Sequence, residues 1–107
     1  QLVFILQRGV RFPQGPPFFM SFYVYMLKSV SSPKFKTYVG FTNNIKSRVS
    51  KHNTNKGAKA TRGYKWIVIY SRRFKEKKEA MSFEYRLKKN RIKRASILKD
   101  YLDDQRN

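Results

Sequence analysis

The sequence contains no cysteine, a single histidine and no long apolar run. The absence of cysteine excludes disulfide partners, thiolate nucleophiles and cysteine-bound zinc. One histidine, His52, cannot build a histidine-rich metal site. The apolar run at residues 2–6 is shorter than a membrane span or a usual signal-peptide core. These absences leave a small set of chemistries, and we expect no membrane partner.

Acidic residues are also scarce, with 6 Asp and Glu against 25 Lys and Arg, and none of the acids precedes residue 76. Two-metal phosphoryl chemistry usually needs several convergent carboxylates, which this chain hardly has to spare. The formal net charge of +19 attracts polyanions and points to nucleic acid before a membrane surface. We therefore expect a cytoplasmic location, associated with the nucleoid.

The hydrophobic content of the sequence suffices for one small folded domain, because 40% of the 107 residues are hydrophobic. We predict a single domain over residues 20–107. Residues 1–19, which are rich in proline, are expected to be disordered or a spurious leader before a start at Met20.

The residue patterns predict an α/β (α+β) fold, in which a small three-stranded mixed or antiparallel sheet is flanked by helices. Strands that alternate or are continuously apolar are expected at 22–28, 36–41 and 66–74. Helices with caps and three-four apolar spacing are expected at about 44–52, 76–90 and 92–104. The third strand is apolar on both faces at its start, which predicts the centre of a covered sheet.

Polar side chains interrupt the apolar faces of two of these helices. Glu84 lies four residues after Ala80 and therefore points along an apolar stripe. Arg48 and His52 occupy the same kind of position on the first helix. A carboxylate in such a place is costly unless it is paired or bound to a cation. Glu84 is therefore either a metal ligand or half of a buried ion pair with an arginine.

Six short motifs follow one another along the chain: "YVY" at 23–25, "YVG" at 38–40, Arg48, "KHN" at 51–53, "GAKATRG" at 57–63 and "FEYRLKK" at 83–89. Together they resemble the GIY-YIG nuclease family over about residues 21–98. The likeness is best to small stand-alone bacterial members, and extends to the N-terminal nuclease domain of the excinuclease and to Slx-type nucleases. Two positions depart from the family pattern, namely Tyr23 in place of a glycine and Phe41 in place of a frequent lysine.

The resemblance implies a metal-dependent endonuclease that hydrolyses DNA phosphodiester bonds with one divalent ion, Mg²⁺ or Mn²⁺. Tyr25 would activate or orient the attacking water, and Tyr38 would position the water or the phosphate. Arg48 would stabilise charge on the phosphate, Glu84 would hold the metal, and His52 could carry a proton. Cations around Tyr25 are expected to lower the pKa of its phenol. The four residues other than His52 are expected to converge on one concave, positively charged surface.

DNA contacts are expected from a basic loop and from residues near the motifs, namely Gly40, Lys51, Lys56, Lys59 and Arg62. Gly40 is expected to leave room for a backbone phosphate. Because the sequence has no zinc finger or helix-turn-helix, we predict low sequence specificity. Branched or damaged DNA, or a targeting protein partner, would then set selectivity, in repair or recombination.

An alternative from another class is a catalytically silent module that binds DNA or structured RNA, because lysines and aromatic residues serve RNA equally well. A binding module has no need for Tyr25, Tyr38, Arg48 and Glu84 together. The motif set therefore favours the enzyme.

Overall fold

The computed structural model describes residues 21–30 and 35–105, so the expectation for residues 1–19 lies outside the described residues. The described elements are, in chain order, β1 (Phe22–Ser29), β2 (Thr37–Thr42), α1 (Ile45–Asn53), the 3₁₀ turn η1 (Lys59–Thr61), β3 (Trp66–Phe74), α2 (Lys77–Lys89) and α3 (Arg91–Gln105). The predicted α+β fold with three strands and flanking helices is confirmed. In this part of the chain no helix is long and apolar enough to cross a membrane.

The sheet is antiparallel throughout and has the order β2-β1-β3. The prediction that the third strand is central is wrong, because β1 takes the centre and hydrogen-bonds on both sides. β3 is apolar on both faces for another reason. Helices cover both faces of the sheet, so even an edge strand needs apolar residues on its two sides.

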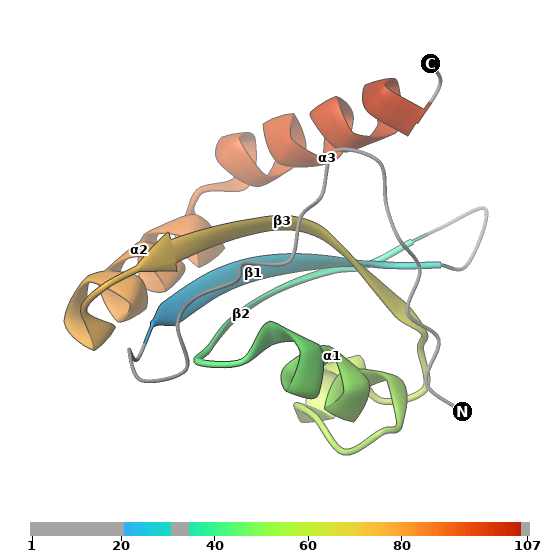
Figure 1. Ribbon diagram of the computed structural model, residues 1–107. Coiled ribbons are helices and arrows are strands. Elements are labelled where there is room, and N and C mark those ends of the chain that lie inside the picture. Colours follow the sequence, from blue (N-terminus) through green and yellow to red (C-terminus); the bar gives the residue numbers. More distant parts are fainter. Residues whose placement is uncertain (1–20, 31–34, 106–107) are drawn as a thin grey trace.

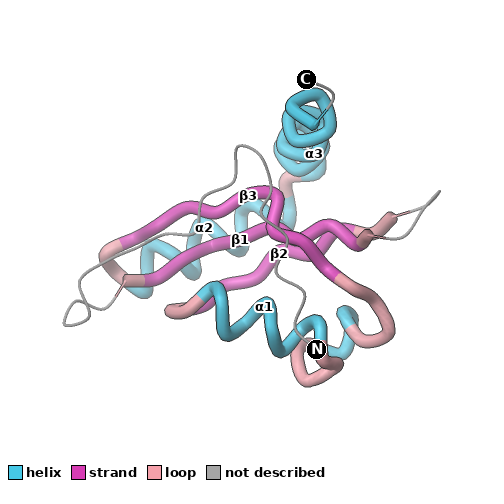
Figure 2. The backbone as a smooth tube through the Cα atoms, turned by 45° about the vertical axis from the view of Figure 1, so that its right-hand side comes forward, coloured by secondary structure: helices cyan, strands magenta, loops and turns pink. Residues whose placement is uncertain are grey.

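The helices form two layers, with α1 on one face of the sheet and α2 and α3 on the other (Figure 1 and Figure 2). Successive side chains of β1 point to opposite faces. Tyr23, Tyr25 and Leu27 therefore pack in the core under α1. Val24 and Met26 pack in the core under α2 and α3. This alternation directs the Tyr25 phenol toward α1.

A two-residue link joins β2 to α1, and it fixes where α1 starts. Asn44 caps the helix, and its side chain accepts a hydrogen bond from the Ser47 backbone N–H at 3.0 Å. Ile45 and Val49 are buried against the sheet. Arg48 and His52, one turn apart, are thereby held beside the tyrosine-bearing strands.

Candidate active site

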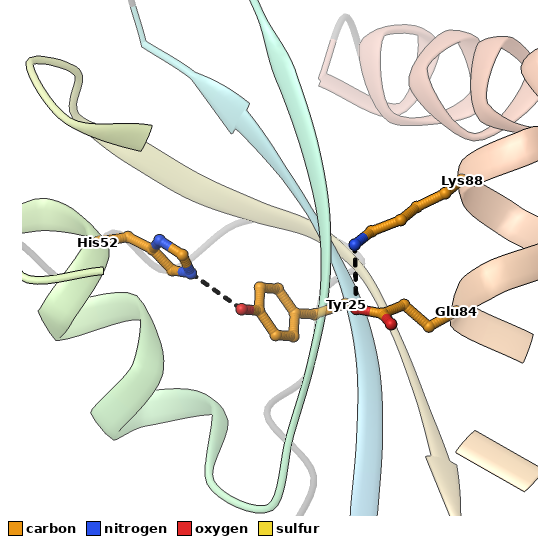
Figure 3. Close-up of polar contacts among 4 residues, drawn as sticks. All are labelled: Tyr25, His52, Glu84 and Lys88. Atoms are coloured by element: carbon orange, nitrogen blue, oxygen red, sulfur yellow. Dashed lines mark hydrogen bonds and ion pairs between the residues drawn. The ribbon is translucent and has the colours of Figure 1, made fainter. Parts of the chain in front are cut away.

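A buried hydrogen bond joins Tyr25 and His52 at the centre of the α1 side of the sheet. The Tyr25 hydroxyl and His52 Nε2 are 2.9 Å apart, and the two side chains point toward each other (Figure 3). Both side chains are fully buried. Tyr25 comes from the central strand and His52 from the last turn of α1, so the contact depends on the packing of α1 against the sheet.

Thr61 determines which nitrogen of His52 carries the proton. The Thr61 hydroxyl donates its only proton to the Ala58 carbonyl, at 2.7 Å. His52 Nδ1, which is 2.8 Å from the Thr61 oxygen, must therefore be the donor in that contact. Nε2 is then unprotonated and accepts the proton of the Tyr25 hydroxyl. Tyr25, His52 and Thr61 form a directed chain of hydrogen bonds.

Two glycines make room for this chain. A Cβ at Gly40 would overlap the Tyr25 hydroxyl oxygen, and a Cβ at Gly57 would overlap His52 Nδ1, each far inside van der Waals contact. The space that Gly40 leaves is thus filled by Tyr25 itself, and Gly40 is buried. The missing side chain of Gly40 thus makes room for the Tyr25 phenol, and the predicted phosphate contact of Gly40 stays a prediction.

Gly40→Ala should therefore damage the site and lower stability together. The added methyl group must displace the Tyr25 ring, and overpacking of this kind costs about 1–3 kcal/mol. We expect a clear fall in the midpoint of thermal unfolding, measured by circular dichroism, and loss of any activity that needs Tyr25. Thr37→Ala, at an exposed position of the same strand, is the matched control and should change neither. An unchanged melting temperature in Gly40→Ala would contradict the close contact.

The pKa values of the pair keep both groups neutral at pH 7. Burial raises the pKa of the Tyr25 phenol; a hydrogen bond and the charge from Arg48 oppose this shift, while the charges of Tyr38 and Glu84 add to it. The expectation that cations lower this pKa is wrong for the protein alone, because burial outweighs Arg48. Burial, with a smaller effect of Arg48, lowers the pKa of His52 to about 4.

Tyr38 and Arg48 complete the α1 side of the site. The Tyr38 ring lies 5.1 Å from the His52 ring, measured between centroids. Arg48 is half-buried, and its guanidinium affects the pKa of both Tyr25 and His52. Of the five predicted catalytic residues, the structure brings together Tyr25, Tyr38, Arg48 and His52.

Glu84 lies in the other layer, away from these four residues. It lies on α2, whose buried residues pack against the opposite face of the sheet from Tyr38, and Figure 3 shows it across the strands from the Tyr25 ring. The four residues expected on one surface therefore do not share one face of the sheet. The Glu84 carboxylate is still near enough for its charge to raise the pKa of Tyr25. Its ion-pair partner is Lys88 at 3.5 Å, and not an arginine.

A cleft at the exposed edge of β2 connects the two layers. It has a volume of about 460 Å³ and is lined by Arg48 and Lys51 from α1 and by Lys77 from α2. Lys77 and Glu84 are seven residues apart, close to two helical turns, and so lie along the same side of α2. A phosphate group in this cleft can be approached from both faces of the sheet.

Glu84 does not line this cleft, and as a lone carboxylate it suits one divalent ion of the Mg²⁺ type. Among the described residues there is no group of three or more His, Cys, Asp or Glu side chains that could hold a metal. Mg²⁺ usually keeps several waters and binds through one or two carboxylates together with substrate phosphates. The Glu84 side chain is 22% exposed, and the Lys88 side chain that pairs with it is half-exposed. The single carboxylate therefore fits an ion that is completed by water and phosphate.

The predicted DNA-contacting cations are all exposed. Lys51 lies on α1, and Lys56, Lys59 and Arg62 lie on the loop that follows it. The loop is tied to the fold by Asn53, whose side chain accepts from the Trp66 backbone N–H at 2.6 Å and donates to the Trp66 carbonyl. A fixed loop presents its charges in a defined arrangement.

Sequence reasoning did not find the roles of Thr61, Gly57 and Asn53. Thr61 and Gly57 stand inside "GAKATRG", which the residue pattern indicates only as a basic loop. The signal available was the clustering of small residues between the cations. Loops lack the periodicity that marks inward-facing side chains, so this signal could not show that Thr61 is fully buried.

Comparison with known proteins identifies the family of this chain. The family described as "GIY-YIG catalytic domain" matches residues 21–95. The chain therefore belongs to the GIY-YIG family. Its relatives include a UPF0213 protein of Oceanobacillus iheyensis, 45% identical over 62% of this chain and 74% of that protein. Another is the UPF0213 protein YazA of Bacillus subtilis, 38% identical over 65% of this chain and 69% of that protein.

A solved relative is the solution NMR structure of a UPF0213 protein from Bacillus halodurans. It is 34% identical, covers 75% of this chain and 84% of its own, and superposes with a TM-score of 0.45. The match covers 74% and 69% of the two relatives named above, so these proteins are small chains. The predicted likeness to small stand-alone GIY-YIG members is confirmed.

Proposed function

We propose that the protein is an endonuclease that hydrolyses DNA phosphodiester bonds with one divalent metal ion. The observation that carries this proposal is the buried Tyr25–His52 pair, in which His52 is fixed as the proton acceptor. A phenol that is hydrogen-bonded to a neutral imidazole forms a route for a proton. A protein that only binds nucleic acid has no use for such a route.

In the proposed reaction a water molecule attacks phosphorus beside Tyr25. Because Tyr25 is fully buried in the protein alone, this scheme requires the site to open toward the cleft when DNA binds. The water gives a proton to the Tyr25 oxygen while the Tyr25 proton moves to His52 Nε2. The bond from phosphorus to the leaving sugar oxygen breaks, and that oxygen takes a proton from solvent. The protonated His52 then returns its proton to solvent through Tyr25, which restores the starting state. A free phenolate need not form at any stage, which is compatible with the raised pKa of Tyr25.

Arg48 has two roles in this scheme. Its guanidinium stabilises the negative charge that develops on the phosphate. In the protein alone, the same charge helps to lower the pKa of His52. A bound phosphate offsets the charge of Arg48, so His52 becomes a better proton acceptor when DNA is in place. Tyr38, which contacts the His52 ring, helps to orient the water or the phosphate.

Glu84 would hold the metal ion, Mg²⁺ or Mn²⁺. When bound, the ion stabilises the leaving oxygen and the phosphate charge. Lys88 neutralises Glu84 when the ion is absent. Because the pair is partly exposed, it contributes little to stability and can open at low cost.

The exposed cations support a nucleic-acid substrate and low sequence specificity, and membership of the GIY-YIG family favours DNA. Phosphate contacts fix the position of a duplex and carry no sequence information directly. Selection of branched or damaged DNA, through DNA shape or a protein partner, would place the activity in repair or recombination.

Replacing Lys59 and Arg62 together with alanine should weaken binding alike for all DNA sequences. Each lost phosphate contact lowers the slope of log affinity against log salt by about 0.9 on duplex DNA, so we expect the slope to fall by about 1.8. Fluorescence anisotropy titrations at several salt concentrations measure this slope, and cleavage at saturating DNA should survive. Lys99→Ala with Lys93→Ala, on α3, is the control and should leave the slope unchanged. A sequence-dependent loss of binding would contradict the assignment.

A nicking assay on single-stranded, duplex and branched DNA, with Mg²⁺, Mn²⁺ or EDTA, tests the proposed function. We expect cuts that require the divalent ion. The competing possibility is the catalytically silent module that binds DNA or RNA. Binding without cuts under every metal would favour that module and overturn the endonuclease.

A further inference from the structure

We propose that the cleft at the edge of β2 holds one unpaired nucleotide beside the phosphate that is cut, with its base stacked on Phe41 and Phe22. This inference rests on the proposed function, because it takes DNA as the substrate of the site. It adds the structural class of DNA, namely DNA with a nucleotide that is not base-paired.

The two phenylalanines form a stacked aromatic pair in the wall of the cleft, and a base would continue this stack. Phe22 and Phe41 come from neighbouring strands, and their rings are nearly parallel, with 15° between planes and 6.0 Å between centroids. Both are half-buried and both line the cleft. Every nucleobase has an aromatic face, and stacking on a protein ring is tolerant of sequence.

The remaining walls match the polar part of a nucleotide. Arg48 and Lys51 on one side and Lys77 on the other supply positive charge for phosphates, and Asn43 and Ser47 supply polar groups. The volume of about 460 Å³ lies within the range of small-ligand sites. Because Arg48 also belongs to the catalytic group, a nucleotide in the cleft is next to the reacting phosphate.

A second cleft also has an aromatic pair beside cations, but its aromatic surface is already covered. This cleft lies between β3 and α2 and contains Phe74 and Phe83, whose centroids are 5.3 Å apart. Arg72 lies over both rings, at 5.0 and 4.8 Å from their centroids. A cation of the chain itself already occupies this aromatic surface, and the cleft also contains the acidic Glu79. It therefore serves as the internal control.

Base-paired DNA cannot use the aromatic wall. A paired base is stacked between its neighbours inside the helix, and it must leave the stack before a side chain can cover its face. That cost is smallest for a base that is already single-stranded or mismatched. The cleft therefore favours single strands, flaps and mismatched sites over intact duplex.

The test compares Phe41→Leu with the wild-type protein in EDTA, so that no cutting occurs. Dissociation constants are measured by fluorescence anisotropy for a flap or single strand and for an intact duplex of the same sequence. We expect the constant for unpaired DNA to rise roughly 5- to 150-fold, the range for loss of one base–aromatic stack. The constant for duplex should change less than about twofold, and Phe83→Leu should change neither.

A second variant keeps the test decisive if Phe41→Leu is poorly folded in thermal unfolding. Phe41→Trp replaces the phenyl ring with a larger aromatic ring, so it should bind unpaired DNA at least as tightly as the wild type. Two results for Phe41→Leu would overturn the inference: equal loss of affinity for unpaired and duplex DNA, or no loss of affinity for either. Weaker binding of unpaired DNA by Phe41→Trp would also overturn it. A different result would overturn the proposed endonuclease instead. In that result the protein binds unpaired DNA more tightly than duplex, as expected, but cuts neither when metal is added.

Discussion

Glu84→Gln is expected to abolish metal-dependent DNA cleavage and to leave DNA affinity equal or slightly higher. Glutamine keeps the size of the side chain but removes the negative charge that attracts a divalent ion. Loss of a side chain that only hydrogen-bonds to a metal ligand lowers metal affinity or activity by about 10- to 100-fold. Loss of the single protein ligand should therefore lower activity further. The removed charge lies on a basic surface, so its loss does not weaken attraction to phosphates.

Initial rates of plasmid nicking at several Mg²⁺ and Mn²⁺ concentrations, with affinities from anisotropy, measure the two effects separately. Glu76→Gln, an exposed acid just before the same helix, is the matched control and should behave like the wild type. Full metal-dependent cutting by Glu84→Gln would show that the metal binds elsewhere. That outcome would be consistent with the position of α2 on the opposite face of the sheet.

Tyr25→Phe is expected to lower the cleavage rate by about 10²- to 10⁴-fold, the usual contribution of a positioned acid or base. The ring and its packing are kept, and only the hydroxyl that joins the water to His52 is lost. His52→Gln should have a similar effect, because glutamine can accept a hydrogen bond but cannot take up the proton. The double variant should be little worse than either single variant, since the two residues act as a unit.

Tyr23→Phe is the control for this series, because Tyr23 is buried in the same core but lies outside the hydrogen-bonded chain. It should keep wild-type rates in single-turnover cleavage. Additive losses in the double variant would contradict a shared proton route. Normal cleavage by Tyr25→Phe would remove Tyr25 from the mechanism.

The Tyr25–His52 pair also predicts how the cleavage rate depends on pH at the acidic end. His52 accepts a proton only while its imidazole is neutral, and its pKa of about 4 keeps it neutral well below the usual value near 6.5. The groups that face it are Tyr25, Tyr38 and Arg48. The value of kcat/KM should therefore hold as pH falls from 7 and decline only as pH approaches about 4. His52→Gln should lack this decline, and a midpoint near 6.5 in the wild type would contradict a buried acceptor.

The elements of the fold could be predicted from the order of residues alone, because local physical chemistry defines them. Alternating and continuous apolar runs marked the three strands, and the Asn44 cap with Ile45 and Val49 marked α1. The same reasoning singled out Arg48, His52 and Glu84, because a polar group on an apolar face is costly and needs a reason. The motifs in order then pointed to the GIY-YIG family, which the comparisons confirm.

How these parts meet depends on the three-dimensional packing. Tyr25 and His52 are 27 residues apart, and their hydrogen bond exists because α1 packs against β1. The strand order places β1 at the centre of the sheet. The face that α2 covers places Glu84 in the opposite layer. Residue periodicity specifies neither of these.

The chemistry of the site also depends on contacts distant in sequence. Thr61 fixes the proton on His52, and Gly40 and Gly57 leave the space that Tyr25 and His52 fill. The pKa of Tyr25 is raised and not lowered because burial in the folded core outweighs the neighbouring cation. Burial is a property of the packed protein, so no count of charges along the chain could have given its sign.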